Sequence, residues 1–561
     1  MLNIRKKKTQ SVCKEDPLSG EEINAKLTLL WQIVTSCYGP RGRLKHVHNN
    51  LGNHIQTTST SAVLFKTIQT SEPLLKLLVA SLQNHTQRYS DCGLFAAILC
   101  LGLVEGAKQL INHNAAEVIS VYKHIQKLCN AYLMGNECKC KIAIDFSSCQ
   151  ELLVVARSVI TSKPACGLNA AETLHISTMV TKAFLQTIPT SSSDSVHLGK
   201  TVMVALEGEA VQKSAVLPGV LIDMPDSFPP DTVVEQYAAT PCRVAVFNAS
   251  LSGDLSEVGE AVMEIHHRGS DVEAGILDTL LELGEQMRRD GVKLFMCQRV
   301  IHPVLQQYLR EHGIVVVERF GIALLDPIIS ATGAQAMATV GTPFPPEAYG
   351  QVDTLRRECF GNRPMLHLLP SGSPAVCTMV LCHRNETVLN ELKLTCEKAL
   401  HVLQLTLKEP YALLGGGCTE THLAAYIRQT IPKTLGISGT VGCSPSDLQL
   451  GAEAFCHALE AVVTTLQRNV GLSTIDHMPT DHVPYASSSS SAEETNAGQP
   501  ESCGCGHFNS RHLEFCSVPP AHSAFNISVL DSFLAKVNAL NVAVEMASLL
   551  LDIKYIINDV N

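Results

Sequence analysis

Hydrophobic positions recur with helical spacing at both ends of this 561-residue chain. In residues 21–134 they recur every three or four positions, interrupted by a turn that begins at Cys37. Two further stripes lie in the C-terminal half. One consists of Leu389, Leu392, Cys396, Leu400, Leu403 and Leu407, and the other of Leu530, Phe533, Val537, Leu540, Val544, Ala547 and Leu551. Such stripes predict amphipathic helices whose apolar face packs on another surface.

The middle of the chain has a different pattern, in which short β-rich runs alternate with helical segments. The strand candidates are residues 219–222, 243–247, 293–296 and 314–317, and the helix candidates are residues 272–289 and 303–312. Strand, helix and strand at this spacing predict an α/β lobe. We therefore expect an α+β multidomain fold, in which a mostly helical domain is split across both termini around an α/β insert.

The apolar run of residues 93–104 is the longest in the chain. It spans 12 residues, whereas a membrane helix needs about 20, so we interpret it as a buried helix. Hydrophobic residues make up 45% of the chain and charged residues 17%, below the ~25% of typical soluble domains. This balance indicates a surface that is partly covered by other lobes or subunits.

Charge and cysteine content narrow the functional classes. The 43 basic and 53 acidic side chains leave a net charge of −10, which disfavours nucleic acid or an acidic membrane as the main partner. The basic N-terminus is not followed by an apolar run, so no secretory signal is expected. We therefore interpret the 21 cysteines as reduced thiols of a cytosolic protein.

Residues 471–500 are predicted to form a disordered loop. A serine run at residues 487–491 is followed by acidic and small polar residues. Such a segment has too few apolar side chains to fold on its own.

The strongest local motif is the triple glycine of Gly415, Gly416 and Gly417, which runs directly into a helical segment. Glycines before a helix let the backbone approach a ligand and direct amide groups at an anion, so the motif is a candidate phosphate contact. The alternative is a close-packed turn before a helix that Thr419 caps. The motif alone leaves both interpretations open.

Two other motifs are weaker candidates. Leu198-Gly-Lys-Thr resembles part of a phosphate-binding loop, but Asp194 stands where that loop needs glycine, so we interpret it as chance. Thiols and a histidine in C-x-C spacing are candidate metal ligands, although the spacing differs from that of zinc sites and favours structural or incidental thiols. These residues are Cys138, Cys140, Cys503, Cys505, His507 and Cys516.

Several motifs together resemble the group II chaperonin family. They are the turn Cys37-Tyr-Gly-Pro-Arg-Gly-Arg, the run Ser90-Asp-Cys-Gly, and Leu405-Thr-Leu-Lys-Glu-Pro followed by the triple glycine. The likeness covers nearly the whole chain apart from residues 471–500, and it is strongest to the chaperonin-like Bardet–Biedl branch of the family.

The resemblance implies three nested domains. The equatorial domain would comprise residues 1–150 and 408–561, and the intermediate domain residues 151–214 and 366–407. The α/β apical domain would comprise residues 215–365. This agrees with helical ends around an α/β middle.

The resemblance also implies a nucleotide site with ATP and magnesium, but one that departs from the family. Ser59 stands where the family has an aspartate, Cys92 to Leu94 replace a Gly-Thr-Thr run, and Lys398 stands where the family has its general base. Because a charged lysine cannot accept a proton from water, efficient hydrolysis is not expected and no catalytic residue is assigned. The residues left to bind a nucleotide weakly are Gly39, Asp91, Gly415, Gly416, Gly417 and Asp531, of which Asp91 would contact magnesium.

The function implied by the resemblance is that of an assembly chaperone. It would act with the other chaperonin-like Bardet–Biedl proteins and the cytosolic TCP-1 ring chaperonin on subunits of the BBSome, in the cytosol and at the centrosome and ciliary basal body. Two alternatives stay open. One is an active chaperonin ATPase that uses Glu397, and the other is a nucleotide-independent centrosomal scaffold.

Overall fold

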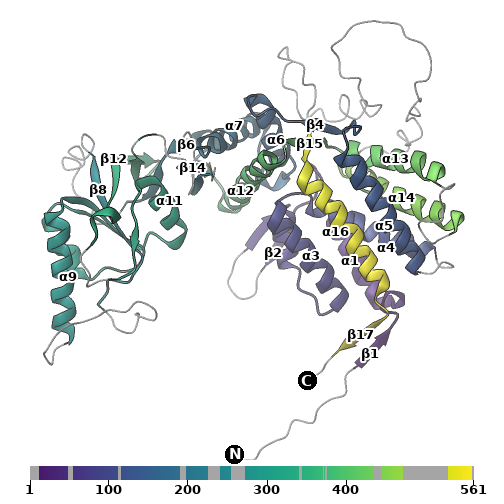
Figure 1. The fold of residues 1–561 in the computed structure, drawn as a ribbon, viewed down its shortest axis with the longest axis horizontal. Helices are drawn as coiled ribbons and strands as arrows, with labels where there is room; N and C mark the ends of the chain where they lie inside the picture. Colours follow the sequence, from purple (N-terminus) through teal and green to yellow (C-terminus); the bar gives the residue numbers. More distant parts are fainter. Residues whose placement is uncertain are drawn as a thin grey trace, which may run out of the picture. The chain divides into compact units, whose positions relative to one another are not determined.

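The computed structural model describes residues 12–48, 55–110, 115–189, 198–224, 241–253, 272–339, 344–370, 372, 376–434, 444–471 and 529–558 (Figure 1). Contacts divide the chain into two compact units, Met1–Thr178 with Asn390–Asn561 and Met179–Leu389. The chain passes from one unit to the other within helices α7 (Ala170–Gln186) and α12 (Glu386–Lys408). The predicted loop at residues 471–500 lies outside the described residues beyond Gly471.

The first unit is built from helices of both chain ends. The N-terminal helices are α1 (Glu21–Cys37), α2 (Ser61–Thr67), α3 (Pro73–Tyr89), α4 (Gly93–Gln109), α5 (Ala115–Met134) and α6 (Cys149–Thr161). The C-terminal helices are α13 (Cys418–Thr434), α14 (Pro445–Val470) and α16 (Phe533–Asp552). Helix α4 packs against both α14 and α16, so one hydrophobic core contains residues from the two ends (Figure 1).

Small residues let α4 and α14 approach closely. A Cβ atom at Gly102 would lie 3.2 Å from the Cβ of Ala458, and one at Gly106 would lie 3.2 Å from the Cβ of Ala454. Side chains of α4 are buried on nearly every face, as the apolar run at residues 93–104 predicts. Among the described residues α16 is the one helix long and apolar enough to span a membrane, and it is mostly buried within this unit.

Three small sheets complete the first unit. Strand β15 (Tyr411–Leu414) pairs with β16 (Leu530–Ser532) and with β4 (Lys141–Ala143), all antiparallel. Strand β2 (Lys45–His48) forms a hairpin with β3 (Ile55–Thr58), and β1 (Val12–Glu15) pairs with β17 (Tyr555–Asn558). These pairings join segments that lie up to several hundred residues apart, including the two chain ends.

The second unit is an α/β structure. Its large sheet has the strand order β10-β9-β8-β12-β13-β7, with β11 (Ala336–Met337) also paired to β8. The strands are β7 (Val220–Asp223), β8 (Cys242–Phe247), β9 (Val292–Cys297), β10 (Val315–Glu318), β12 (Gly350–Phe360) and β13 (Arg363–Pro370). Strands β8, β9 and β10 are parallel because helices α9 (Val272–Arg289) and α10 (Pro303–Glu311) connect them.

A second sheet in this unit has the order β5-β14-β6, with β5 (Lys200–Glu207), β6 (Ala215–Pro218) and β14 (Val376–His383). Helix α11 (Ile322–Thr332) packs against β5 and against β12 of the large sheet. The Walker-like fragment falls at the start of β5, where Lys200 forms an exposed ion pair with Asp326 at 2.5 Å. It is therefore the beginning of a strand and has no phosphate-loop geometry.

The four predicted strands and two predicted helices of the middle segment are confirmed to within about two residues at each end. The segments at residues 21–134 and 418–551 share one core, as the split-domain prediction requires. Five of the six residues in the stripe on α12 are buried, but Leu407 is 38% exposed. The three-domain bounds stay a prediction, because the observed division is into two units.

The shared core gives a direct stability prediction. Phe455 on α14 is fully buried and meets Tyr122 of α5 edge to face, with ring centroids 5.8 Å apart. Phe455→Ala should lower the unfolding free energy of the helical unit by about 3–5 kcal/mol, because it removes a large buried side chain and leaves a cavity. Denaturant unfolding followed by the fluorescence of Trp31, the single tryptophan of the chain, measures this.

Leu450→Ala provides the matched control on the same helix, because Leu450 is 45% exposed. Its effect should stay within about 1 kcal/mol. Equal effects of the two variants would contradict the packing described for α14.

Candidate nucleotide site

A cavity of about 180 Å³ lies in the helical unit. Four of the six predicted binding residues line it, namely Gly39, Asp91, Gly416 and Asp531. They come from the turn after α1, the turn between α3 and α4, the turn before α13, and β16. Gly415 and Gly417 belong to the same turn as Gly416 but do not line the cavity.

The three glycines of this turn have different surroundings. Gly416 has a φ of +68°, and a Cβ placed there would meet no atom within 4 Å, so its backbone is open to the cavity. A Cβ at Gly417 would lie 3.3 Å from Val463 of α14, and one at Gly415 would lie 2.7 Å from Val529. Gly415 and Gly417 therefore form the close-packed turn, and the phosphate contact stays a prediction, for which the backbone of Gly416 leaves room.

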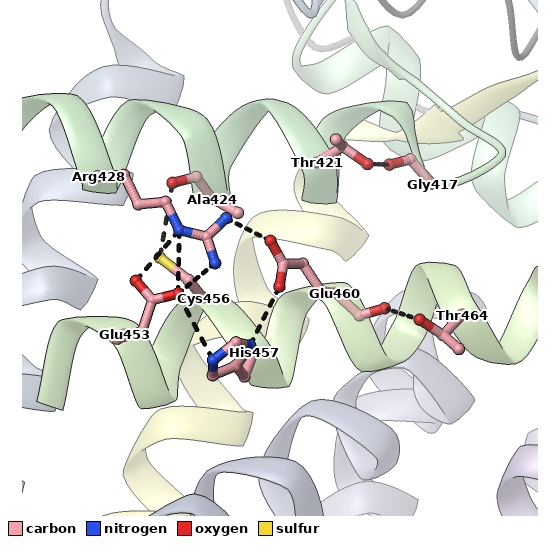
Figure 2. A network of polar contacts seen from close by, with 9 residues as sticks. All are labelled: Gly417, Thr421, Ala424, Arg428, Glu453, Cys456, His457, Glu460 and Thr464. Atoms are coloured by element: carbon pink, nitrogen blue, oxygen red, sulfur yellow. Dashed lines mark hydrogen bonds and ion pairs between the residues drawn. The ribbon is translucent and has the colours of Figure 1, made fainter. Parts of the chain in front are cut away.

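Polar contacts between α13 and α14 fix the helix that follows the turn (Figure 2). Arg428 on α13 donates to both oxygens of Glu453, at 3.1 and 3.2 Å from Nε, and to Glu460. At the beginning of α13, Thr421 donates its hydroxyl to the carbonyl of Gly417 at 2.9 Å. Thr419 was expected to cap this helix. It donates instead to the carbonyl of Leu414 at 2.7 Å, because the helix already begins at Cys418.

Asp531 is part of a buried ion-pair cluster. Lys536 on α16 donates to Asp531 at 2.9 Å and to Glu420, and its ammonium lies 4.0 Å from the centre of the Phe95 ring. Burial by itself would lower the pKa of Lys536, but the two carboxylates outweigh it and raise that pKa well above its usual value. Lys536 therefore stays charged, and it occupies one oxygen of Asp531.

Asp91 lies in a strained turn. Its neighbours Ser90 and Cys92 have φ values of 60° and 59°, in the left-handed region that costs a residue other than glycine about 1 kcal/mol or more. The ring of His85 bonds to the Asp91 carbonyl at 2.9 Å. Burial raises the pKa of the Cys92 thiol well above its usual range, so Cys92 presents an uncharged thiol to the cavity.

The loop that carries Ser59 is held by a residue that the sequence analysis did not single out. Glu391 on α12 is fully buried. It accepts hydrogen bonds from the hydroxyls of Thr58 and Thr60 at 2.9 and 2.8 Å, and from the backbone amide of Ser59 at 3.1 Å. In the sequence, only the run of Thr and Ser residues at 57–61 points to this contact, because it supplies hydroxyl donors but no nearby carboxylate to accept from them.

Lys398 lies seven residues after Glu391, two turns along the same face of α12. It is 8% exposed, and its ammonium has no hydrogen-bond partner among the described residues. Burial lowers the pKa of Lys398 to about 7, and the nearby charge of Lys163 acts in the same direction. The carboxylates of Glu391 and Asp91 oppose this shift.

Metal-ligating side chains do not gather in the part of the chain that the structure describes: no group of three or more His, Cys, Asp or Glu residues could hold an ion. Asp91 is the predicted magnesium contact, and Lys163 lines the same cavity. Cys138 and Cys140 are buried thiols of the helical core. The other candidate ligands, Cys503, Cys505, His507 and Cys516, lie outside the described residues.

The comparisons with known proteins agree with the resemblance drawn from the motifs. The model of the TCP-1/cpn60 chaperonin family matches residues 30–561. The chain is 42% identical to the molecular chaperone MKKS of Homo sapiens and 41% identical to that of Mus musculus, over 99% of both chains in each case. It is 25% identical to the thermosome subunit beta of Methanothermobacter thermautotrophicus, over 80% of this chain and 78% of that one.

The unpartnered lysine predicts how stability depends on pH. Below about pH 7 Lys398 is charged in the folded and the unfolded protein, so folding carries the full cost of burying the charge. Above pH 7 the folded amine is neutral while the unfolded one stays protonated, so this residue makes the free energy of unfolding rise with pH, by about 1.4 kcal/mol per pH unit.

Lys398→Met should therefore stabilise the helical unit most at about pH 6, and the gain should shrink between about pH 7 and pH 9. Urea unfolding followed by Trp31 fluorescence measures the difference between variant and wild type at each pH. Lys393→Met on the same helix, at a partly exposed position, is the control and should leave the pH slope unchanged. A constant difference between Lys398→Met and wild type at every pH would contradict the buried, uncompensated amine.

Proposed function

The chain belongs to the TCP-1/cpn60 chaperonin family, and from this membership we propose that it is a molecular chaperone that assists assembly of the BBSome, a coat complex that serves cilia. It acts with the other chaperonin-like Bardet–Biedl proteins and with subunits of the cytosolic TCP-1 ring chaperonin, and BBSome subunits are its clients. It works in the cytosol, at the centrosome and at the ciliary basal body. The proposal is supported by the human relative of 42% identity, which is named a molecular chaperone.

In this proposal the cavity binds ATP but turns it over slowly. The supporting observation is that residues from four separate turns and strands, including Gly39, Asp91 and Gly416, meet at one cavity. An open glycine backbone and a cationic wall suit a phosphate chain. At the two positions where the family has aspartates, this chain has Ser59 and Lys398. The cavity can therefore bind a nucleotide but has no general base.

Two observations weigh against the alternative of an active ATPase. Glu397 is exposed and lies about 100° around α12 from Lys398, the position of the family's general base, so it is poorly placed to activate water. Glu391 is buried nearby, but hydroxyl and amide donors from residues 58–60 occupy its oxygens. Its oxygens are therefore directed at these donors and not at a water molecule in the cavity.

Restoring the acid tests the slow-turnover proposal. Lys398→Asp should raise ATP hydrolysis by the purified full-length chain by about 10²-fold, the size of a typical general-base contribution. Lys398→Met removes the lysine without adding a base and should leave the rate low. Fast hydrolysis by the wild type that disappears in Asp91→Ala would instead establish an active ATPase.

A rescue experiment tests the assembly role. Cells that lack this chain should accumulate unassembled BBSome subunits, measured by size separation of the native complexes, and the wild-type chain should restore assembly. Asp91→Ala should restore it poorly, because Asp91 lines the cavity. Full rescue by Asp91→Ala would favour the nucleotide-independent scaffold, and normal assembly without the chain would exclude the proposed role.

A further inference from the structure

The buried amine of Lys398 has no hydrogen-bond partner among the residues that the structure describes. Buried polar groups in proteins are nearly always hydrogen-bonded, so an unpartnered ammonium indicates an acceptor from outside the chain. The acceptor must be an anion or carry strong acceptor oxygens, since Lys398 offers only donors. Lys398 does not itself line the cavity, but the face of α12 that carries it contacts residues at the cavity wall: Glu391 accepts from the amide of Ser59, which lines the cavity, and His401 bonds to Ser90 beside Asp91.

The charged and titratable groups around Lys398 come from four elements. They are Glu391, Cys396, Glu397 and His401 on α12, Lys163 after α6, Cys166 in the following turn, and Asp91 between α3 and α4. Two of the possible acceptors, Glu391 and His401, are already in hydrogen bonds, and the nearby thiol of Cys166 points its donor elsewhere. Glu391 accepts from residues 58–60, His401 shares a hydrogen bond with Ser90 at 2.7 Å, and the thiol of Cys166 donates to Thr395 at 3.3 Å.

Divalent magnesium fits this environment poorly. Magnesium requires an octahedron of oxygen ligands, usually one or two carboxylates together with phosphates. Of the two cavity-lining aspartates, Asp531 is already paired with Lys536, which leaves Asp91 as a single carboxylate, the fewest that magnesium commonly uses, so the fit is decided by the neighbouring cations. The two amines of Lys163 and Lys398 lie close enough to repel each other and to repel a further cation.

A phosphate group fits the same environment well. It would lie between Lys163 and Lys398, neither of which forms an ion pair among the described residues, and would offset their mutual repulsion. Lysine has a flexible four-carbon stem and three donors, so its ammonium can reach a phosphate oxygen at the cavity wall. The open backbone at Gly416 leaves room for the rest of a phosphate chain.

We propose that Lys398 supplies the positive charge that magnesium supplies elsewhere in the family, so that this chain binds the phosphates of ATP without a metal ion. The proposal rests on the nucleotide binding proposed above and specifies its chemistry. Because the free amine is only partly protonated near neutral pH and a bound phosphate favours its charged form, binding takes up a proton. Affinity therefore falls as pH rises above about 7.

Titration calorimetry of the full-length chain with ATP tests this. The dissociation constant should be equal within about twofold in EDTA and in magnesium, and it should rise by up to tenfold per pH unit between about pH 7.5 and pH 9. In that range the phosphate itself is fully ionised. Binding heats measured in two buffers of different ionisation enthalpy give the number of protons taken up per ATP bound, which should lie between zero and one.

Three variants separate the role of the lysine from general effects. Lys398→Met should weaken ATP binding by about tenfold or more and abolish the proton uptake. The control Lys393→Met should bind as the wild type does. Lys398→Asp should bind ATP only when magnesium is present, because it exchanges the fixed cation for a carboxylate ligand.

Each other outcome has a definite meaning. Saturable binding that EDTA abolishes, or that Lys398→Met leaves unchanged, would overturn the metal-independent site while leaving nucleotide binding intact. No ATP binding at any pH would overturn the nucleotide-binding part of the proposed function together with this inference. Inorganic phosphate that reproduces the pH-dependent heat at the same concentration as ATP would assign the site to free phosphate and overturn the nucleotide as its ligand.

Discussion

The buried charge of Lys536 is the interaction on which the architecture of the helical unit depends. The ammonium comes from α16, its partners Asp531 and Glu420 come from β16 and the first turn of α13, and it lies over the ring of Phe95 on α4. Removing one partner of such a buried pair costs about 3–5 kcal/mol, because an unpaired charge is left behind. The cluster therefore fixes the glycine turn and one wall of the cavity relative to both ends of the chain.

A comparison of the two buried lysines explains why one is structural and the other is free to act. Lys536 and Lys398 are 3% and 8% exposed, so both lose the solvation of their charge. Two carboxylates keep Lys536 charged, whereas Lys398 has no such contact in the described part of the chain, and burial lowers its pKa to about 7. Burial without a partner reduces stability, and a ligand anion is the means by which this loss can be recovered on binding.

The periodicity of the sequence was sufficient for the helices, because an amphipathic stripe is a local property, as the buried run of α4 illustrates. The periodicity did not predict hairpins such as β2–β3 and β12–β13. The position of a strand in a sheet also depends on its pairing with strands elsewhere in the chain, as β12 pairs with β8. The family motifs pointed to Gly39, Asp91, Gly416 and Asp531 as site residues, and the structure has all four at one cavity. The hydrogen bonds of Glu391 with residues 58–60 join segments more than 300 residues apart. No local sequence pattern predicts such a pairing.

On the proposed function, slow turnover would change what a nucleotide can do in this protein. A chaperonin that hydrolyses ATP repeats a cycle, whereas a subunit that only binds can shift an equilibrium between conformations by its differential affinity for them. The shift is reciprocal, so a partner that prefers the nucleotide-bound form also tightens nucleotide binding. On the proposed function, α12 is suited to transmit such a shift, because it carries Lys398 in the helical unit and continues past Leu389 into the α/β unit. A bound nucleotide that is not hydrolysed would then change the affinity of this chain for its assembly partners. The energy for any repeated cycle would come from those partners.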